Sequence, residues 1–192
     1  FMSYLAYALK FTGRIYGLTG TIGMKAHQDF LSKVYNVDSV IIPSFIQKRL
    51  AVFPNIATSD EDWIRTITES AIRIAGDDNR VVLIVAETLQ DVKRIEAAIR
   101  DANYTKGPIL RYGDGNKEMH KIVQEATHTS GTIIVATNLA GRGTDIQHDV
   151  NQFGGLHVIL SFLGDSYRST RQVEGRPARG PDYGSVQMII NA

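Results

Sequence analysis

The sequence has 192 residues, enough for one domain or one domain and part of another, and its hydrophobic content of 43% suffices for a buried core. Its 21 basic and 20 acidic residues nearly balance, which gives no support for a strongly basic nucleic-acid surface. The chain has no cysteine, which excludes disulfides and thiolate metal sites, and no apolar run approaches the roughly 20 residues that span a bilayer.

The N-terminal part predicts alternating helices and strands followed by a connector. Apolar residues at helical spacing and short β-branched runs give the elements in order: helix 4–11, strand 14–18, helix 24–34 and strand 38–43. The helix at 24–34 is expected to bury Phe30, Leu31 and Val34. Residues 44–58 lack periodicity and contain Pro54, so they predict a connector. We place a domain boundary near Ser44.

The middle of the chain continues the alternation. Ser59 followed by Asp62 predicts a helix N-terminus, and the acids at 60–62 favour the helix dipole better than they fit a Mg²⁺ site, because no apolar strand precedes them. The elements expected after this helix are strand 81–85, helix 89–99, strand 109–112 and helix 119–126. Strands alternating with helices predict an α/β fold with a mostly parallel sheet covered on both faces.

A strand at 132–136 leads into the stretch with the strongest chemical signal. Gly141 and Gly143 flank Arg142 and let the backbone approach a ligand closely. The guanidinium of Arg142 is a planar donor suited to phosphate, and the carboxylate of Asp145 accepts from sugar hydroxyls. At the carboxyl end of a parallel strand, this set predicts a nucleotide site.

A second stretch carries two arginines three residues apart. Strand 156–160 and a helix at 167–173 lead to Gly175, Arg176 and Arg179, and strand 186–190 follows. Paired arginines near a nucleotide favour stabilisation of charge on a transferred phosphoryl group. The alternatives are an ordinary loop for the first stretch and a solvated helix face for the second. The five histidines show no metal-ligand spacing, so no metal site is predicted.

Together, these motifs resemble those of SecA, the ATP-driven motor family of bacterial protein export. The resemblance rests on GLTGT at 17–21, ATNLAGRGTDI at 136–146, GGLHVI at 154–159 and QVEGRPARG at 172–180. It implies a RecA-like three-layer αβα fold. Residues 1–43 would be the end of a first RecA-like motor domain, and residues 44–192 would be the whole second domain.

The resemblance also implies roles for individual residues. Asp145 would contact the ATP ribose, Arg142 would face the phosphates, and Arg176 and Arg179 would act as arginine fingers. The remaining implied cofactor-binding residues are Gly141, Gly143, Gln172 and Gly175. Mg²⁺ would be held outside this chain, which has neither a G-x-x-x-x-G-K-[ST] motif nor a strand ending in paired acids.

Partners and alternatives follow from the same resemblance. The implied partners are the first motor domain, a preprotein and the membrane translocon, with a cytoplasmic location or a peripheral one at the membrane. Nucleic acid is not expected, yet a module of a superfamily two helicase is the alternative motor. Glu174 and Pro177-Ala178 replace the family's arginine and serine-glycine, which leaves a non-catalytic regulator as a third hypothesis. The isolated chain is expected to lack ATPase activity.

Overall fold

The computed structural model describes residues 3–11, 14–112, 128–138, 150–164, 167–178 and 180–192, without the side chains at 167–169 and 172. The described residues fall into two compact units. One comprises residues 1–45 and 164–172, and the other comprises residues 46–163 and 173–192. The predicted helix at 119–126 lies outside the described residues.

The larger unit is built on a parallel β-sheet. Its described strands run in the order β1-β7-β6-β3-β5-β4, with β2 also paired to β7, and every pairing is parallel. The strands are β1 Arg49–Val52, β2 Ile56–Thr58, β3 Val82–Ala86, β4 Ile109–Tyr112, β5 Ile133–Thr137, β6 Leu156–Leu160 and β7 Tyr183–Asn191. The predicted parallel α/β sheet is therefore confirmed.

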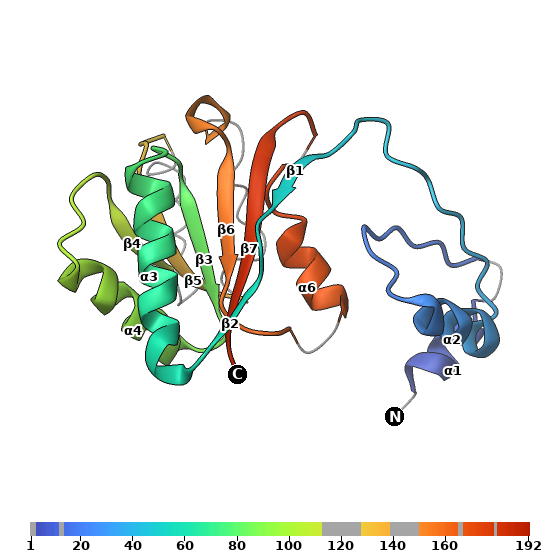
Figure 1. Ribbon diagram of the computed structural model, residues 1–192. Coiled ribbons are helices and arrows are strands. Elements are labelled where there is room, and N and C mark those ends of the chain that lie inside the picture. The colour runs from blue at the N-terminus through green and yellow to red at the C-terminus, as the bar shows by residue number, and fades with distance from the viewer. Residues whose placement is uncertain (1–2, 12–13, 113–127, 139–149, 165–166, 179) are drawn as a thin grey trace. The chain divides into compact units, whose positions relative to one another are not determined.

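Two helices cover one face of this sheet, as Figure 1 shows: α3 (Asp60–Gly76) and α4 (Leu89–Asp101). Their apolar stripes pack with the central strands into one core cluster that includes Trp63, Ile67 and Ile95. On the opposite face a second cluster joins strand residues to Val150 of the short helix η1 (Val150–Phe153) and Val173 of α6 (Tyr167–Glu174). Both faces of the central strands are thus buried, as the continuous apolar runs predict.

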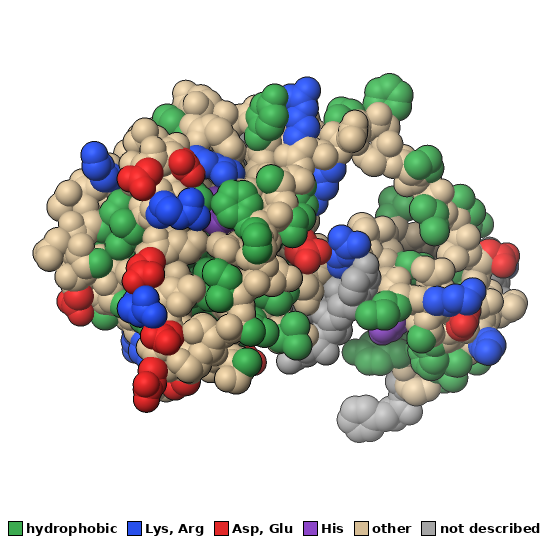
Figure 2. Space-filling view, viewed as in Figure 1, with side chains coloured by type: hydrophobic (Ala, Val, Ile, Leu, Met, Phe, Trp, Pro, Cys, Tyr) green, Lys and Arg blue, Asp and Glu red, His purple; other side chains and the backbone are tan. Residues whose placement is uncertain are grey.

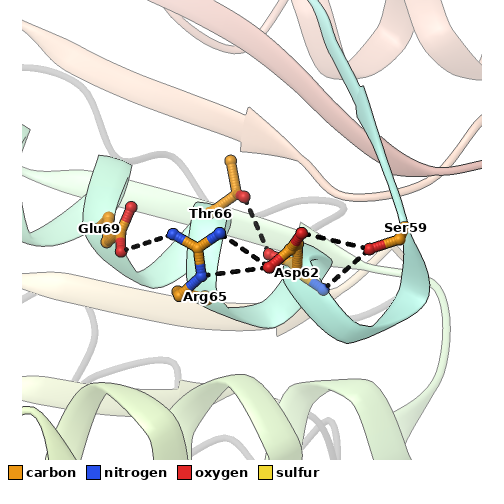
Figure 3. Close-up of polar contacts among 5 residues, drawn as sticks. All are labelled: Ser59, Asp62, Arg65, Thr66 and Glu69. Carbon is orange, nitrogen blue, oxygen red and sulfur yellow. Dashed lines mark hydrogen bonds and ion pairs between the residues drawn. The ribbon is translucent and has the colours of Figure 1, made fainter.

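Helix α3 begins as the sequence predicts. The Ser59 hydroxyl accepts from the backbone N–H of Asp62 at 3.3 Å, and the Asp62 carboxylate accepts from Ser59 and from Arg65 (Figure 3). The hydrogen bond and the positive charge of Arg65 lower the pKa of Asp62. Arg65 also reaches Glu69 one turn later, at 3.1 Å. The acids at 60–62 therefore lie in the first turn of α3, as predicted.

The smaller unit departs from the sequence predictions. Helices α1 (Tyr4–Leu9) and α2 (Lys25–Tyr35) form as expected, but residues 14–18 and 38–43 are not strands. A strand needs a neighbour for its backbone hydrogen bonds, and the described part of the chain gives these segments none. Their side chains are accordingly exposed, with Leu18 at 98% and Val40 at 88%. Phe30, expected to be buried, is 54% exposed.

The predicted connector at 44–58 is also partly wrong, because it contains β1 and β2. Phe53, Pro54 and Asn55 form the bend between these two strands. The buried side chain of Gln187 on β7 holds the bend, since its amide donates to the Pro54 carbonyl at 3.1 Å. Its amide oxygen accepts from Ser70 of α3 at 2.8 Å. About half of the expected connector is therefore part of the sheet.

Candidate functional site

The carboxyl ends of three adjacent strands, β6, β3 and β5, form a polar edge. The backbone N–H of Asn138, one residue beyond β5, donates to Ala86 at the end of β3 at 3.2 Å. Ser161, one residue beyond β6, bonds the Val85 carbonyl through its N–H at 3.0 Å and its hydroxyl at 3.1 Å. The Asn138–Ala86 hydrogen bond thus fastens the end of β5, which leads into the glycine-arginine stretch, to β3.

Trp63 also contacts this edge, and the sequence indicated only a core position for it. Its indole N–H donates to two carbonyls, that of Ser161 at 3.1 Å and that of Ile189 at 3.0 Å. The guanidinium of Arg94 on α4 lies 5.9 Å from the Trp63 ring centroid. The start of α3 is therefore fastened to the ends of β6 and β7. A single tryptophan in the first turn of an amphipathic helix is too weak a signal to predict this role.

The second predicted site segment is the turn that follows α6, at 175–178. The Arg176 N–H donates to the Val173 carbonyl at 3.0 Å, and the Arg176 residue is only 8% exposed. A solvated helix face therefore does not describe Arg176, because the residue lies beyond the helix and is buried. Buried arginines require compensating polar contacts. Arg176 is therefore a packed residue of the turn, not a solvated surface residue.

Close packing fixes this arginine turn against the beginning of β7. A Cβ placed on Gly184 would lie 2.5 Å from both the Ala178 nitrogen and the Pro177 Cβ, so only glycine fits there. Ala178 is itself buried and has a φ of 55°, a left-handed conformation unusual for alanine. The Lys48 ammonium donates to the Glu174 carbonyl at 3.1 Å where α6 ends. The turn is therefore held at the amino end of β7.

The described parts of the two site segments lie at opposite ends of the parallel strands. Asn138 follows the carboxyl end of β5, whereas Pro177 and Ala178 lie beside the amino end of β7. The chain resumes after the first segment at η1, next to the amino end of β6. There the Asn151 amide oxygen accepts from the Tyr183 N–H at 3.0 Å. Asn151 follows the first predicted motif and Tyr183 follows the second. This hydrogen bond therefore joins the segments that follow the two motifs.

The structure describes only some of the predicted site residues. Gly175 and Arg176 lie in the arginine turn, and Gln172 lies in the last turns of α6. The other predicted site residues lie outside the described residues: Gly141, Arg142, Gly143, Asp145 and Arg179. Their roles therefore stay predictions.

Two residues of the GGLHVI motif have structural roles. A Cβ on Gly155 would lie 2.1 Å from the Tyr183 carbonyl oxygen, so glycine lets β6 approach β7. His157 is fully buried, and its Nδ1 lies 2.7 Å from the Ser185 hydroxyl. Burial, together with the positive charges of Arg80 and Arg73, lowers the pKa of His157 to about 3. His157 is therefore a neutral, buried side chain that helps to hold β6 against β7.

Neither a metal cluster nor a membrane span is found in the described part of the chain. No group of three histidine or acidic side chains there has a metal-binding arrangement. No helix among the same residues combines the length and apolar character needed to cross a bilayer.

Known proteins with similar sequences are protein translocase subunits. The chain is 31% identical over 185 residues to SecA 2 of Nitrosospira multiformis and 32% identical over 182 residues to SecA 2 of Rhodopirellula baltica. The alignments cover 93% and 91% of this chain but 26% of each relative. The SecA subunit of Flavobacterium psychrophilum is 30% identical, with 93% of this chain and 16% of the relative covered. No protein-family model matches the chain.

Solved structures with a similar fold are helicase domains. Domain 2 of the DEAD-box helicase Mss116p, bound to an RNA duplex, matches with a TM-score of 0.57 at 20% identity, over 74% of this chain and 54% of that one. The E. coli DEAD-box protein SrmB, bound to the regulator RraA, matches with a TM-score of 0.53 at 15% identity, over 77% and 79%. These likenesses establish a RecA-like fold.

Proposed function

Because the chain is SecA-like over more than nine-tenths of its length and has a RecA-like fold, we propose that it is part of an ATP-driven protein translocation motor. Residues 1–43 would complete a first motor domain, and residues 44–192 would form the second. The similarity to translocase subunits is the observation that carries this proposal. The chain spans about a quarter of the length of the SecA 2 relatives.

ATP is the proposed ligand, shared between this chain and a first motor domain that carries the phosphate loop. The chemistry of the donor set fits ATP, since arginine forks pair with phosphate oxygens and a carboxylate accepts from ribose hydroxyls. In this proposal Asp145 binds the ribose, and Arg142 faces the phosphates. Arg176 and Arg179 stabilise charge in the transition state, with Gly141, Gly143, Gln172 and Gly175 lining the site. Mg²⁺ would neutralise phosphate charge from ligands in the first domain.

The proposed partners are a preprotein and a membrane translocon, with the motor on the cytoplasmic side of the membrane. Nucleic acid is not a proposed substrate. On the face drawn in Figure 2, acidic and basic side chains are interspersed over α3 and α4, without a continuous basic stripe. Nucleic-acid tracks in proteins combine such a stripe with exposed aromatic side chains.

The test compares two possible activators of ATP hydrolysis. The full-length natural protein that carries this sequence is assayed for phosphate release alone, with an unfolded secretory polypeptide, and with single-stranded or duplex RNA and DNA. We expect stimulation by the polypeptide only. The isolated 192-residue chain should show no turnover above buffer, because it lacks the phosphate loop.

The alternative functions give different results. Stimulation by RNA or DNA, with binding that weakens steeply as salt rises, would assign the chain to a nucleic-acid helicase. A full-length protein that binds no ATP would be a non-catalytic regulator. Either result would overturn the translocase proposal.

A further inference from the structure

Two consecutive basic residues, Lys48 and Arg49, contact the two ends of the segment that carries the arginine turn. Lys48 donates to the Glu174 carbonyl at 3.1 Å, where α6 ends. The Arg49 guanidinium lies 4.8 Å from the ring centroid of Tyr183, where β7 begins. Arg49 and Tyr183 are also paired residues of the β1–β7 ladder. Residues 48–49, here named the basic clamp, therefore contact both the start and the end of segment 174–183.

The chemistry of each contact is favourable. The last carbonyls of a helix lack intrahelical partners and carry partial negative charge, so a lysine ammonium is a suitable cap at Glu174. A guanidinium over the face of a tyrosine ring gains from the quadrupole of the ring. Neither contact depends on the side chains within the turn, so the clamp holds the turn by its ends.

The clamp lies where the chain passes between its two compact units. The chain crosses from one unit to the other at residues 45/46, 163/164 and 172/173. Lys48 is the third residue after the first of these crossings, and Glu174 is the second residue after the last. Both residues belong to the sheet-containing unit. Their hydrogen bond therefore joins, within that unit, two segments that directly follow a crossing.

We propose that the basic clamp positions the arginine turn, so that Arg176 keeps its place against the sheet of its own unit. This inference deepens the proposed function and rests on it, because it assigns to Lys48 a positioning role for an arginine that acts on ATP. Lys48 itself touches no nucleotide in this proposal. It acts through the end of α6.

The first test needs no ATP. Hydrogen exchange at the Arg176 amide is followed by mass spectrometry in the isolated chain and in a Lys48→Met variant, which keeps the length of the side chain but loses its charge. Loss of a helix-terminus contact should speed exchange about twofold to fivefold. Lys48→Arg should restore the original rate. Lys93→Met, at an exposed lysine of α4, should change nothing. Unaltered exchange in Lys48→Met would overturn the clamp whatever the protein does with ATP.

The second test separates positioning from simple packing. In the full-length protein, Lys48→Met should lower kcat for ATP hydrolysis about fivefold, the low end of couplings between distinct sites, with nucleotide affinity unchanged. Lys48→Arg should recover most of the rate. Faster exchange without a change in kcat would overturn the positioning role. If the full-length protein has no ATPase activity, the proposed function fails and the positioning role with it, whereas the exchange result still decides whether the clamp exists.

Discussion

At the residue scale, Ala178 combines burial with an unfavourable backbone conformation. Its φ of 55° lies in the left-handed region, where a Cβ collides with the neighbouring carbonyl oxygen. The SecA pattern has glycine at this position, which adopts the same conformation without that collision. Alanine here keeps the shape of the turn but leaves strain beside Arg176.

Ala178→Gly should therefore stabilise the fold. Relief of about 1–2 kcal/mol of left-handed strain outweighs the larger unfolded-state entropy of glycine, so the free energy of unfolding should rise by about 0.5–1 kcal/mol. Urea denaturation followed by Trp63 fluorescence measures the change, since the chain has one tryptophan. Ala75→Gly, inside α3, is the control and should destabilise by about 1 kcal/mol. A loss of stability in Ala178→Gly would contradict the strain argument.

His157 gives the fold a dependence on pH. Its folded pKa of about 3 is far below the value near 6.5 expected in the unfolded chain. The unfolded state therefore binds the extra proton first as pH falls. The stability from neutral His157 is fully present above pH 6.5 and is lost between pH 6.5 and 3. The slope is about 1.4 kcal/mol per pH unit, or about 2 kcal/mol between pH 6.5 and 5.

A His157→Gln variant isolates this contribution. Glutamine can still bond Ser185 but cannot take up a proton, so its unfolding free energy should fall less steeply than that of the parent below pH 6.5. Urea titrations at pH 7, 6 and 5 give the two slopes. His128→Gln, at an exposed histidine, should follow the parent. If the unfolding free energies of His157→Gln and of the parent fall equally with pH, protonation of His157 is not the cause of the pH dependence.

At the element scale, helix α3 connects the polar edge to the core. Its cap at Ser59 orients the first turn, from which Trp63 reaches the carbonyls of Ser161 and Ile189. Ser59→Ala removes the acceptor for the Asp62 N–H and should lower the free energy of unfolding by about 1 kcal/mol. Ser59→Asn should retain most of the stability that the cap contributes, because asparagine is also a good N-cap residue.

A matched control uses the other capping serine. Ser3 caps α1 by accepting from the Ala6 N–H at 3.1 Å, but α1 buries no residue. Ser3→Ala should therefore leave the unfolding midpoint reported by Trp63 unchanged. Equal losses in the two alanine variants would mean that the caps act on the whole chain rather than on their own helices.

Strands were predictable where burial alone decides the structure. The central strands β3, β5 and β6 are continuous apolar runs, and those runs are readable because both of their faces are buried. The run at 38–43 has the same β-branched character, and the run at 14–18 is partly apolar, but a strand also needs a neighbour. Short β1 and β2 were missed because Pro54 interrupts them and only their pairing to β7 defines them.

For the candidate site, the sequence predicts a type of chemistry but not a geometry. Glycines, arginines and an aspartate near the end of a strand indicate nucleotide chemistry from composition alone. The packing of Ala178 and Pro177 against Gly184, and the contact of Lys48 with Glu174, depend on residues far apart in the sequence. Spacing along the chain therefore did not reveal which residues hold the arginine turn in place.

At the scale of the whole molecule, the proposed ATP site works only when two motor domains meet. Phosphate-loop contacts would act in both the ground state and the transition state, whereas finger arginines would reach the γ-phosphate only on closure. Interactions made only in the transition state raise kcat without tightening substrate binding. The two kinds of contact are therefore separable by kinetics.

In the full-length protein, Arg176→Ala and Arg179→Ala should each reduce single-turnover ATP hydrolysis on the order of 10³-fold while nucleotide affinity stays close to the parent's. Asp145→Ala should instead weaken nucleotide binding, because its proposed ribose contact exists before the reaction. Arg65→Ala is the control, since Arg65 pairs with Asp62 and Glu69 on the exposed face of α3.

Burial of Arg176 requires one more comparison. The unfolding midpoint of Arg176→Ala must match that of Arg176→Lys, which keeps the charge but loses the planar fork, so that lost activity is not simply lost folding. With matched midpoints, a much larger rate loss in the alanine variant assigns Arg176 to charge stabilisation. If both arginine variants hydrolyse ATP at the parent's rate, Arg176 serves only to hold the turn against β7, and the catalytic assignment of both arginines is wrong.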